Sequence, residues 1–168
     1  QGAVVVLGSY KSTLSLAASD VFKENKIPAI GITCTNPIIT QTNKYYSRVC
    51  FVDAFQGTYA AKYVIEHLKK NGAVALKVEG DDLAATMIEQ FEGKMNRTLG
   101  SENSVKILEY PKDTTDFTEL FDRIEATGYD TIFFPSSSAA AEEVIWQASE
   151  DGYKNWKWLG ASSWADMW

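Results

Sequence analysis

Short apolar runs rich in Val, Ile and aromatic residues alternate with amphipathic segments along almost the whole chain. Such dense runs are typical of strands that are covered on both faces, as in parallel sheets. Their alternation with helices predicts βαβ units, and therefore an α/β fold with doubly wound parallel sheets. The predicted strands are Val4–Leu7, Pro28–Ile32, Ser47–Phe51, Ala73–Val78, Val105–Tyr110, Thr131–Phe134 and Lys157–Leu159.

The segments between these strands carry apolar residues at helical spacing, so each predicts a helix with one apolar face. We expect these faces to lie against the core and not against a cofactor. The stripes are Leu14, Ala17, Ala18, Val21 and Phe22; Ala61, Val64, Ile65 and Leu68; Ala84, Met87, Ile88 and Phe91; and Phe117, Leu120, Phe121 and Ile124. The stretch from Thr33 to Asp53 has no such stripe and is predicted to be non-helical.

A break in this pattern is predicted at Lys70-Asn71-Gly72, where a long helix ends in charged residues and glycine. We predict an incomplete amino-terminal lobe over residues 1–72 and a second lobe with most of its βα units over residues 73–168. The chain starts without Met, almost directly at the first strand, and we interpret both ends as cut from a longer protein. Sheet edges left unpaired by such a cut favour self-association.

Composition and motifs exclude several classes of function. The net charge is −6 and the basic residues are scattered, which argues against nucleic acid as a partner. Lys11-Ser12-Thr13 lacks the preceding glycine of a phosphate-binding loop, and Gly160–Trp164 lacks the second glycine of a nucleophile elbow. The sole histidine, His67, is predicted to lie within a helix, and no metal-ligand spacing occurs. We therefore expect neither an enzyme nor a bound cofactor or metal.

The two cysteines, Cys34 and Cys50, do not decide the redox compartment. Their separation allows pairing, but a sequence does not place two Cα atoms within bridging distance. We favour two buried free thiols, because cysteine behaves readily as a small hydrophobic residue.

Two hydroxyl-rich loops each follow a predicted strand: Gly8–Thr13 after Ala3–Leu7, and Thr33–Pro37 after Ile30–Ile32. In an open parallel sheet, ligands bind beyond the carboxyl ends of the strands. Hydroxyls, backbone N–H groups and one lysine at that edge suit a small anionic or zwitterionic solute. The sequence therefore predicts a binding cleft there.

Each candidate residue also has a purely structural interpretation. In the functional interpretation Ser12 and Thr13 contact a ligand, and in the structural one they only cap a helix. Lys11 would attract an anion in the first and be a solvated loop charge in the second. Tyr10 would stack on a solute in the first and cover the end of the sheet in the second. Thr33 and Thr35 contact a ligand or belong to the turn that Asn36-Pro37 explains.

The later half offers further candidates of the same kind. Trp164 follows the last predicted strand and would form a wall of the cleft. Ser136–Ser138 either line the opposite wall of the cleft or cap a helix, and the acidic loop Glu79–Asp82 is expected to face solvent.

An ordered set of short motifs resembles a known family. The motifs are Leu7-Gly8-Ser9, Ala17-Ala18-Ser19-Asp20, Thr35-Asn36-Pro37, Asp53-Ala54-Phe55-Gln56-Gly57, Asp113-Thr114-Thr115-Asp116-Phe117 and Tyr129-Asp130-Thr131-Ile132. Together they resemble the branched-chain amino-acid-binding group of type I periplasmic solute-binding proteins. The resemblance implies two α/β lobes that close on a ligand by a hinge, and this chain is similar to the middle of such a protein.

The same resemblance implies roles for individual residues. The ligand's carboxylate would lie against the Ser12 loop at the start of a helix, and Thr33 and Thr35 would receive its carboxylate and amine. In the second lobe, the family's usual aromatic and acid are replaced by Ser138 and Ser162. An ammonium group needs fixed acceptors, so these replacements argue against a branched-chain amino acid as the ligand.

By resemblance, the function is that of the extracytoplasmic solute-binding component of an ABC importer, which docks a membrane permease. A periplasmic or extracellular location follows, with a lipoprotein anchor as one form of attachment. Two alternatives stay open. One is a ligand-sensing receptor or regulatory domain of the same fold; the other is a flavodoxin-like enzyme.

Overall fold

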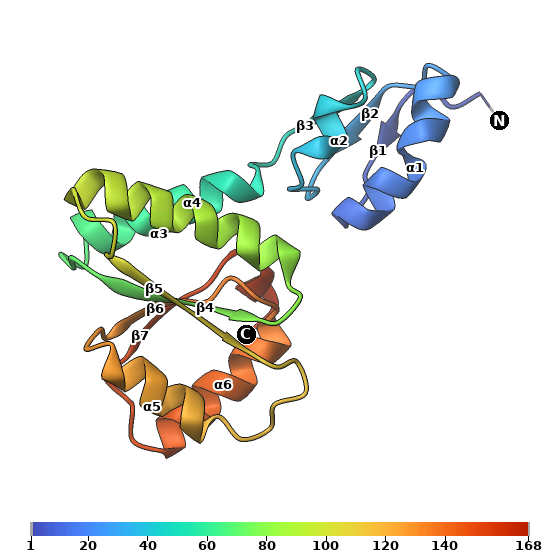
Figure 1. Cartoon of the computed structure of the whole chain (residues 1–168). Helices are drawn as coiled ribbons and strands as arrows, with labels where there is room; N and C mark the ends of the chain where they lie inside the picture. Colours follow the sequence, from blue (N-terminus) through green and yellow to red (C-terminus); the bar gives the residue numbers. More distant parts are fainter. Residues whose placement is uncertain (1, 168) are drawn as a thin grey trace. The chain divides into compact units, whose positions relative to one another are not determined.

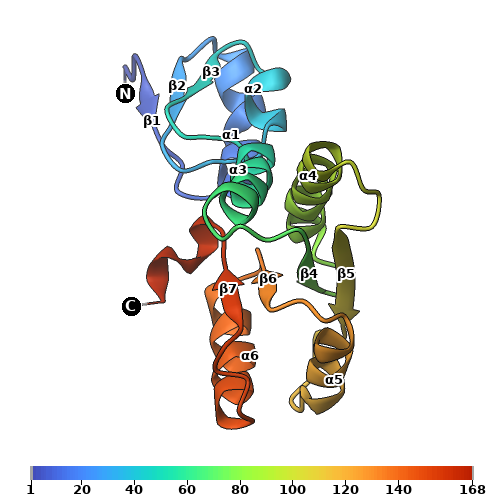
Figure 2. The ribbon, with the colours of Figure 1, turned by 90° about the vertical axis from the view of Figure 1, so that its left-hand side faces the viewer.

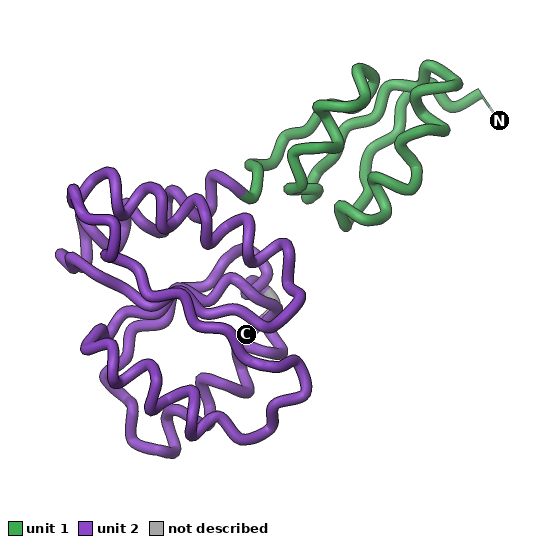
Figure 3. The backbone as a smooth tube through the Cα atoms, in the orientation of Figure 1, with its two compact units in different colours: residues 1–53 green, residues 54–168 purple. Residues whose placement is uncertain are grey.

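The computed structural model describes residues 2–167 and divides the chain into two compact units, residues 1–53 and 54–168 (Figure 3). The sequence places the lobe boundary later, at residue 72. The reason for the difference is helix α3 (Asp53–Glu66), whose Ala61 and Val64 are fully buried against the second unit's sheet. The assignment of residues 1–72 to one lobe of a longer protein stays a prediction.

The first unit is a three-stranded parallel sheet in the order β1-β2-β3, with β1 at Val6–Leu7, β2 at Ala29–Gly31 and β3 at Tyr46–Arg48. Val6, Ala29 and Tyr46 are paired in register and so share one face of the sheet. Helices α1 (Ser12–Glu24) and α2 (Ile38–Gln41) supply Phe22 and Ile39 to the small apolar cluster on these strands.

Two predictions about the first unit are wrong. The stretch after Thr33 contains the short helix α2, and the predicted apolar stripe of α1 is not its buried face: Leu14 and Val21 are each 55% exposed. The buried positions are Ser15 and Ser19. Polar contacts explain this, because the Asn43 amide donates to the Ser19 hydroxyl at 2.9 Å and to the Ser19 carbonyl at 2.8 Å.

The second unit contains β4 (Ala73–Val78), α4 (Asp82–Leu99), β5 (Val105–Tyr110), α5 (Thr118–Ala126), β6 (Thr131–Phe133), α6 (Ser138–Glu150), β7 (Lys157–Leu159) and the 3-10 helix η1 (Ser162–Asp166), besides α3. Its strands form a four-stranded parallel sheet in the order β5-β4-β6-β7. Helices α3 and α4 cover one face and α5 and α6 cover the other (Figures 1 and 2). This doubly wound arrangement confirms the predicted α/β fold with parallel sheets.

Strand β4 shows why the second unit has two cores. Successive side chains of a strand point to opposite faces, so Ala73 and Ala75 pack under α3 and α4, while Val74 and Leu76 pack under α5 and α6. All four are fully buried. The small residues on the first face allow α4 to place Phe91 in stacked contact with Phe133, with ring centroids 4.6 Å apart.

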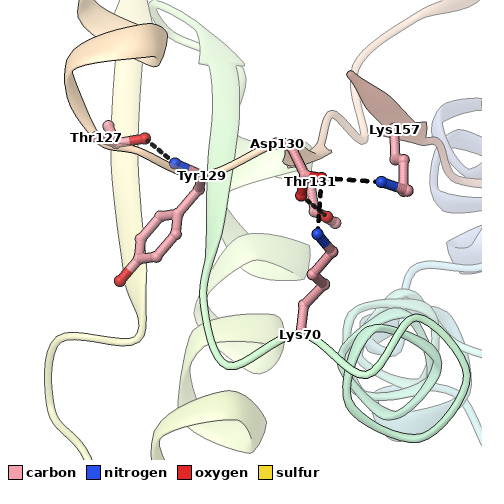
Figure 4. A network of polar contacts seen from close by, with 6 residues as sticks. All are labelled: Lys70, Thr127, Tyr129, Asp130, Thr131 and Lys157. Carbon is pink, nitrogen blue, oxygen red and sulfur yellow. Dashed lines mark hydrogen bonds and ion pairs between the residues drawn. The ribbon is translucent and has the colours of Figure 1, made fainter. Parts of the chain in front are cut away.

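An ion-pair network lies at the amino-terminal edge of this sheet, opposite the edge formed by the carboxyl ends of the strands. Both Lys70 and Lys157 point at Asp130, with Nζ–Oδ2 distances of 2.7 and 2.8 Å (Figure 4). Burial opposes ionisation of Asp130, but hydrogen bonds from Lys157, Lys70 and Thr131 outweigh it and hold its pKa well below the usual range. The network joins the segments that enter β4, β6 and β7.

Of the helices within residues 2–167, none combines the length and the apolar character needed to cross a membrane.

Candidate functional site

In the first unit, the two hydroxyl-rich loops come together at the carboxyl edge of the sheet. The Thr33 hydroxyl donates to the Tyr10 carbonyl at 2.5 Å, and the Asn36 N–H donates to the Ser12 hydroxyl at 3.2 Å. The loops adjoin because β1 and β2 are paired neighbours. Two of the predicted ligand-binding hydroxyls thus tie one loop to the other.

The amino terminus of α1 opens at this edge. Lys11 is the N-cap residue in an extended conformation, and no side chain of the described residues caps the helix. The first N–H groups of a helix lack intrahelical partners and carry partial positive charge. With the exposed Lys11 ammonium and Thr13 in the first turn, they make this edge suited to an anion.

Thr35 differs from Ser12 and Thr33, whose hydroxyls tie the two loops together. It is half-buried, and within the described part of the chain its hydroxyl makes no hydrogen bond. Its carbonyl accepts from the Asp53 N–H at 3.1 Å, which fixes the backbone of the loop. Tyr10, by contrast, is 66% exposed.

Arg48 holds the second loop in place, and sequence reasoning missed it. Its guanidinium donates to the Cys34 carbonyl at 2.8 Å, the Pro37 carbonyl at 3.1 Å and the Thr40 hydroxyl at 2.7 Å. A planar fork of donors suits such a set of oxygens. No signal in a single sequence distinguishes this arginine from a solvated one at a strand end.

Tyr46 holds the first loop and was also missed. Its buried hydroxyl donates to the Gly8 carbonyl at 2.7 Å, accepts from the Ser9 N–H at 3.2 Å and lies 3.0 Å from the Ser15 hydroxyl. Gly8 has a φ of +132°, which an L side chain rarely adopts, so glycine is needed where the chain leaves β1.

In the second unit, a cavity of about 490 Å³ opens at the carboxyl ends of β4, β5 and β6. The order in which the chain adds strands reverses between β4 and β6. Open α/β sheets bind ligands in the crevice that such a reversal leaves at the carboxyl ends of the strands. The lining residues are Val78, Glu79, Gly80, Asp81, Tyr110, Lys112, Thr114, Phe117, Ser136, Ser137, Ala139, Ala140 and Glu143.

Asp81 organises the floor of this cavity. One of its carboxylate oxygens accepts from the Ala84 N–H at 2.9 Å and so caps α4, while the other accepts from the buried Ser136 hydroxyl at 2.9 Å. The Ser136 carbonyl accepts from the Ser163 hydroxyl at 2.7 Å, which extends the contact to η1. The loops after β4, β6 and β7 are thereby fixed to one another.

Aromatic side chains form the apolar wall. Tyr110 is only 5% exposed and meets the edge of Phe117 at a centroid distance of 5.3 Å. Burial, with the Glu143 and Asp81 carboxylates, raises the pKa of Tyr110, so its phenol stays neutral and can donate. Three carboxylates face one lysine, Lys112, in the lining, so the cavity is acidic.

Of the candidates in the second unit, Ser136, Ser137 and Glu79–Asp81 line the cavity, whereas Ser138, Ser162 and Trp164 are not part of its lining. Ser138 begins α6, next to the lining residue Ser137. Ser162 begins η1, and its backbone N–H donates to the Gln56 side chain at 2.7 Å. Trp164 is half-buried and packs edge-on against Phe134, and its buried indole N–H has no partner among residues 2–167.

Comparison with known proteins agrees with this architecture. A family model described as "Periplasmic binding protein" matches residues 1–168. The Leu/Ile/Val-binding protein homolog 1 of Brucella melitensis is 25% identical over 154 residues, which cover 91% of this chain and 41% of that protein. The leucine-binding protein of Thermotoga maritima has 25% identity and a TM-score of 0.78, with coverage of 96% and 45%.

A second similar structure is the solute-binding protein of an ABC transporter from Rhodopseudomonas palustris, solved in complex with 3,4-dihydroxybenzoic acid. It has 21% identity and a TM-score of 0.66 over 96% of this chain and 44% of that protein, and it shows the shared fold. The chain belongs to the periplasmic binding protein family. It spans about two fifths of the length of the curated relatives it matches, 41% of the Brucella protein.

Proposed function

We propose that this chain is part of the extracytoplasmic solute-binding component of an ABC importer. In this proposal the full-length protein binds a small amino-acid-like or carboxylate ligand between two lobes and presents it to a membrane permease. The location is periplasmic or extracellular, with a lipoprotein anchor as one form of attachment. Closure on the ligand would follow from its higher affinity for the closed state.

The observation that carries the proposal is the amino terminus of α1 beside the Thr33–Pro37 loop. Free N–H groups, the Lys11 ammonium and the Thr35 hydroxyl converge on one edge of the sheet. A carboxylate is the common small group that fits such a set of donors. The relatives support this chemistry, because leucine, isoleucine, valine and dihydroxybenzoic acid, which their names mention, all carry a carboxylate.

The experiment is a thermal-shift screen of the full-length protein, followed by titration calorimetry of each hit. The panel contains amino acids, aliphatic carboxylates, aromatic carboxylates and, as a matched set, the corresponding amides. We expect a carboxylate to raise the melting temperature and its amide to have no effect. A neutral solute that binds while all carboxylates fail would contradict the proposal.

A pair of variants locates the site. Thr35→Val removes the unpaired hydroxyl without changing side-chain volume and should weaken binding of the hit about tenfold, the effect of one hydrogen bond to a charged group. Thr98→Val removes an exposed hydroxyl of α4 and serves as the control. Equal affinities of the two variants would rule out the Thr35 hydroxyl as a ligand contact.

A further inference from the structure

The two cysteines leave neighbouring strands at the same edge of the first unit. Strands β2 and β3 pair Gly31 with Arg48, and the Val49 N–H continues this pairing by donating to the Gly31 carbonyl at 3.0 Å. Cys50 is the next residue of the chain, and its Sγ lies 3.4 Å from the carbonyl oxygen of Cys34. This contact brings the Cys50 thiol against the backbone of Cys34 itself, and a disulfide joins residues whose Cα atoms are about 4.4–6.8 Å apart.

The Cys34 side chain turns back over the strand that precedes it. A Cβ added at Gly31 would lie 2.0 Å from the Cys34 Sγ, so glycine is what leaves room for this thiol. Cys34 is fully buried and Cys50 is half-buried. Burial and then the neighbouring Cys34 raise the pKa of Cys50, while Arg48 opposes the rise.

We propose that Cys34 and Cys50 are a redox-active pair that forms an intramolecular disulfide and fixes the candidate ligand loop to the end of β3. Thr33 and Thr35 flank Cys34 directly, so the bond would restrain the backbone of the loop in which they lie. The structure shows the reduced form, with both thiols free. Formation of this bond depends only on the two thiols and not on which ligand the protein binds.

The chemistry balances with a small disulfide, such as oxidised glutathione, as the oxidant. The partly exposed Cys50 thiolate attacks it and forms a mixed disulfide, releasing one glutathione thiolate. The Cys34 thiolate then attacks the Cys50 sulfur, which forms the internal bond and releases the second glutathione. Two cysteine thiols have lost two protons and two electrons, and one glutathione disulfide has gained them.

The test compares the wild-type protein with Cys34→Ser and Cys50→Ser after incubation with oxidised glutathione and acid quenching. Peptide mapping by mass spectrometry without reduction should show the Cys34 and Cys50 peptides linked in the wild type. The Cys34→Ser protein should keep a stable glutathione adduct on Cys50, because the resolving thiol is gone. The Cys50→Ser protein should remain unmodified, because Cys34 is buried.

Stability gives a second readout. The oxidised wild type should melt several degrees above its reduced form, since a crosslink restricts the unfolded chain, while the two serine variants should show no such difference. A wild type that accumulates the Cys50 adduct, or whose thiols stay free, would overturn the proposal. So would a linked form that melts at or below the reduced form, because the bond would then not fit the folded loop.

Discussion

Arg48 makes three hydrogen bonds to the loop between β2 and α2, and each bond uses a different direction of the guanidinium. A lysine has the same charge but no planar fork, so it cannot satisfy three oxygens in these directions. We predict that Arg48→Lys lowers the free energy of unfolding by about 1–2 kcal/mol, measured by urea denaturation. Arg97→Lys, at an exposed position of α4, should change it little; similar losses in both variants would refute the assigned role.

Asp130 provides a pH-dependent contribution to stability. Its pKa is lower in the folded protein than in the unfolded chain, so its contribution is complete above the unfolded pKa and is lost as the pH falls below about 4. We predict that Asp130→Asn costs about 1 kcal/mol at pH 7, a small value because the three side chains are partly solvated. Urea denaturation at several pH values checks this.

In those measurements the difference in the free energy of unfolding between wild type and Asp130→Asn should decrease steadily as the pH is lowered. The exposed carboxylate of Asp113 supplies the control, since Asp113→Asn should not alter the pH profile. If this difference in the free energy of unfolding is constant from neutral to acidic pH, the ion pairs with Lys70 and Lys157 do not contribute to stability.

Helix α3 approaches the backbone of α4 closely at Gly57. A Cβ at Gly57 would lie 2.0 Å from the Met87 carbonyl oxygen and 3.1 Å from the Phe91 nitrogen, and both are backbone atoms that cannot rotate away. We predict that Gly57→Ala destabilises the protein by about 1–3 kcal/mol despite the better helix propensity of alanine. Thermal or urea unfolding measures the change.

Gly93 of α4 is the matched control. The three atoms nearest to a Cβ there all belong to the Arg97 guanidinium, the first at 3.0 Å, and that flexible side chain can move. Gly93→Ala should therefore stabilise the protein by up to about 1 kcal/mol. If both substitutions stabilise, α3 and α4 do not approach as closely as described.

Elements buried by apolar packing were predictable, and elements buried by polar contacts were not. Strands β4, β5 and β7 have the predicted bounds, because dense apolar runs mark them. Helix α1 presents Ser15 and Ser19 to the interior, so its apolar stripe indicated the wrong face. Hydrogen bonds from distant residues decide that orientation, and no local pattern records them.

The candidate site also has a part that the sequence predicts and a part that it does not. The two loops of the first unit were predictable, because strand order places the carboxyl ends of β1 and β2 together. The cavity of the second unit was only partly predictable, from its acidic loop and its serines. Tyr110 and Phe117 belong at once to the apolar core and to the cavity wall, and their spacing indicates only the core.

For the whole molecule, the sequence predicts association of the isolated chain, and the first unit supports that prediction. Strand β1 has one neighbour in its sheet, and Leu7 at its end is 67% exposed. Unpaired, apolar strand edges favour pairing with another chain. We predict concentration-dependent association in light scattering, reduced by Leu7→Lys with the circular dichroism spectrum unchanged. A monodisperse monomer at every concentration would contradict this.

The small apolar cluster of the first unit has a thermodynamic consequence. Its fully buried apolar residues are few, namely Ala29, Cys34, Ile39 and Tyr46, and polar contacts provide much of the remaining cohesion. The heat capacity of unfolding follows the apolar area exposed, so the signal in calorimetry should come mainly from residues 54–168. Amide hydrogens around the Gly8–Thr13 and Thr33–Pro37 loops should exchange before those of residues 54–168. Local opening of the candidate binding edge therefore does not require the second unit to unfold.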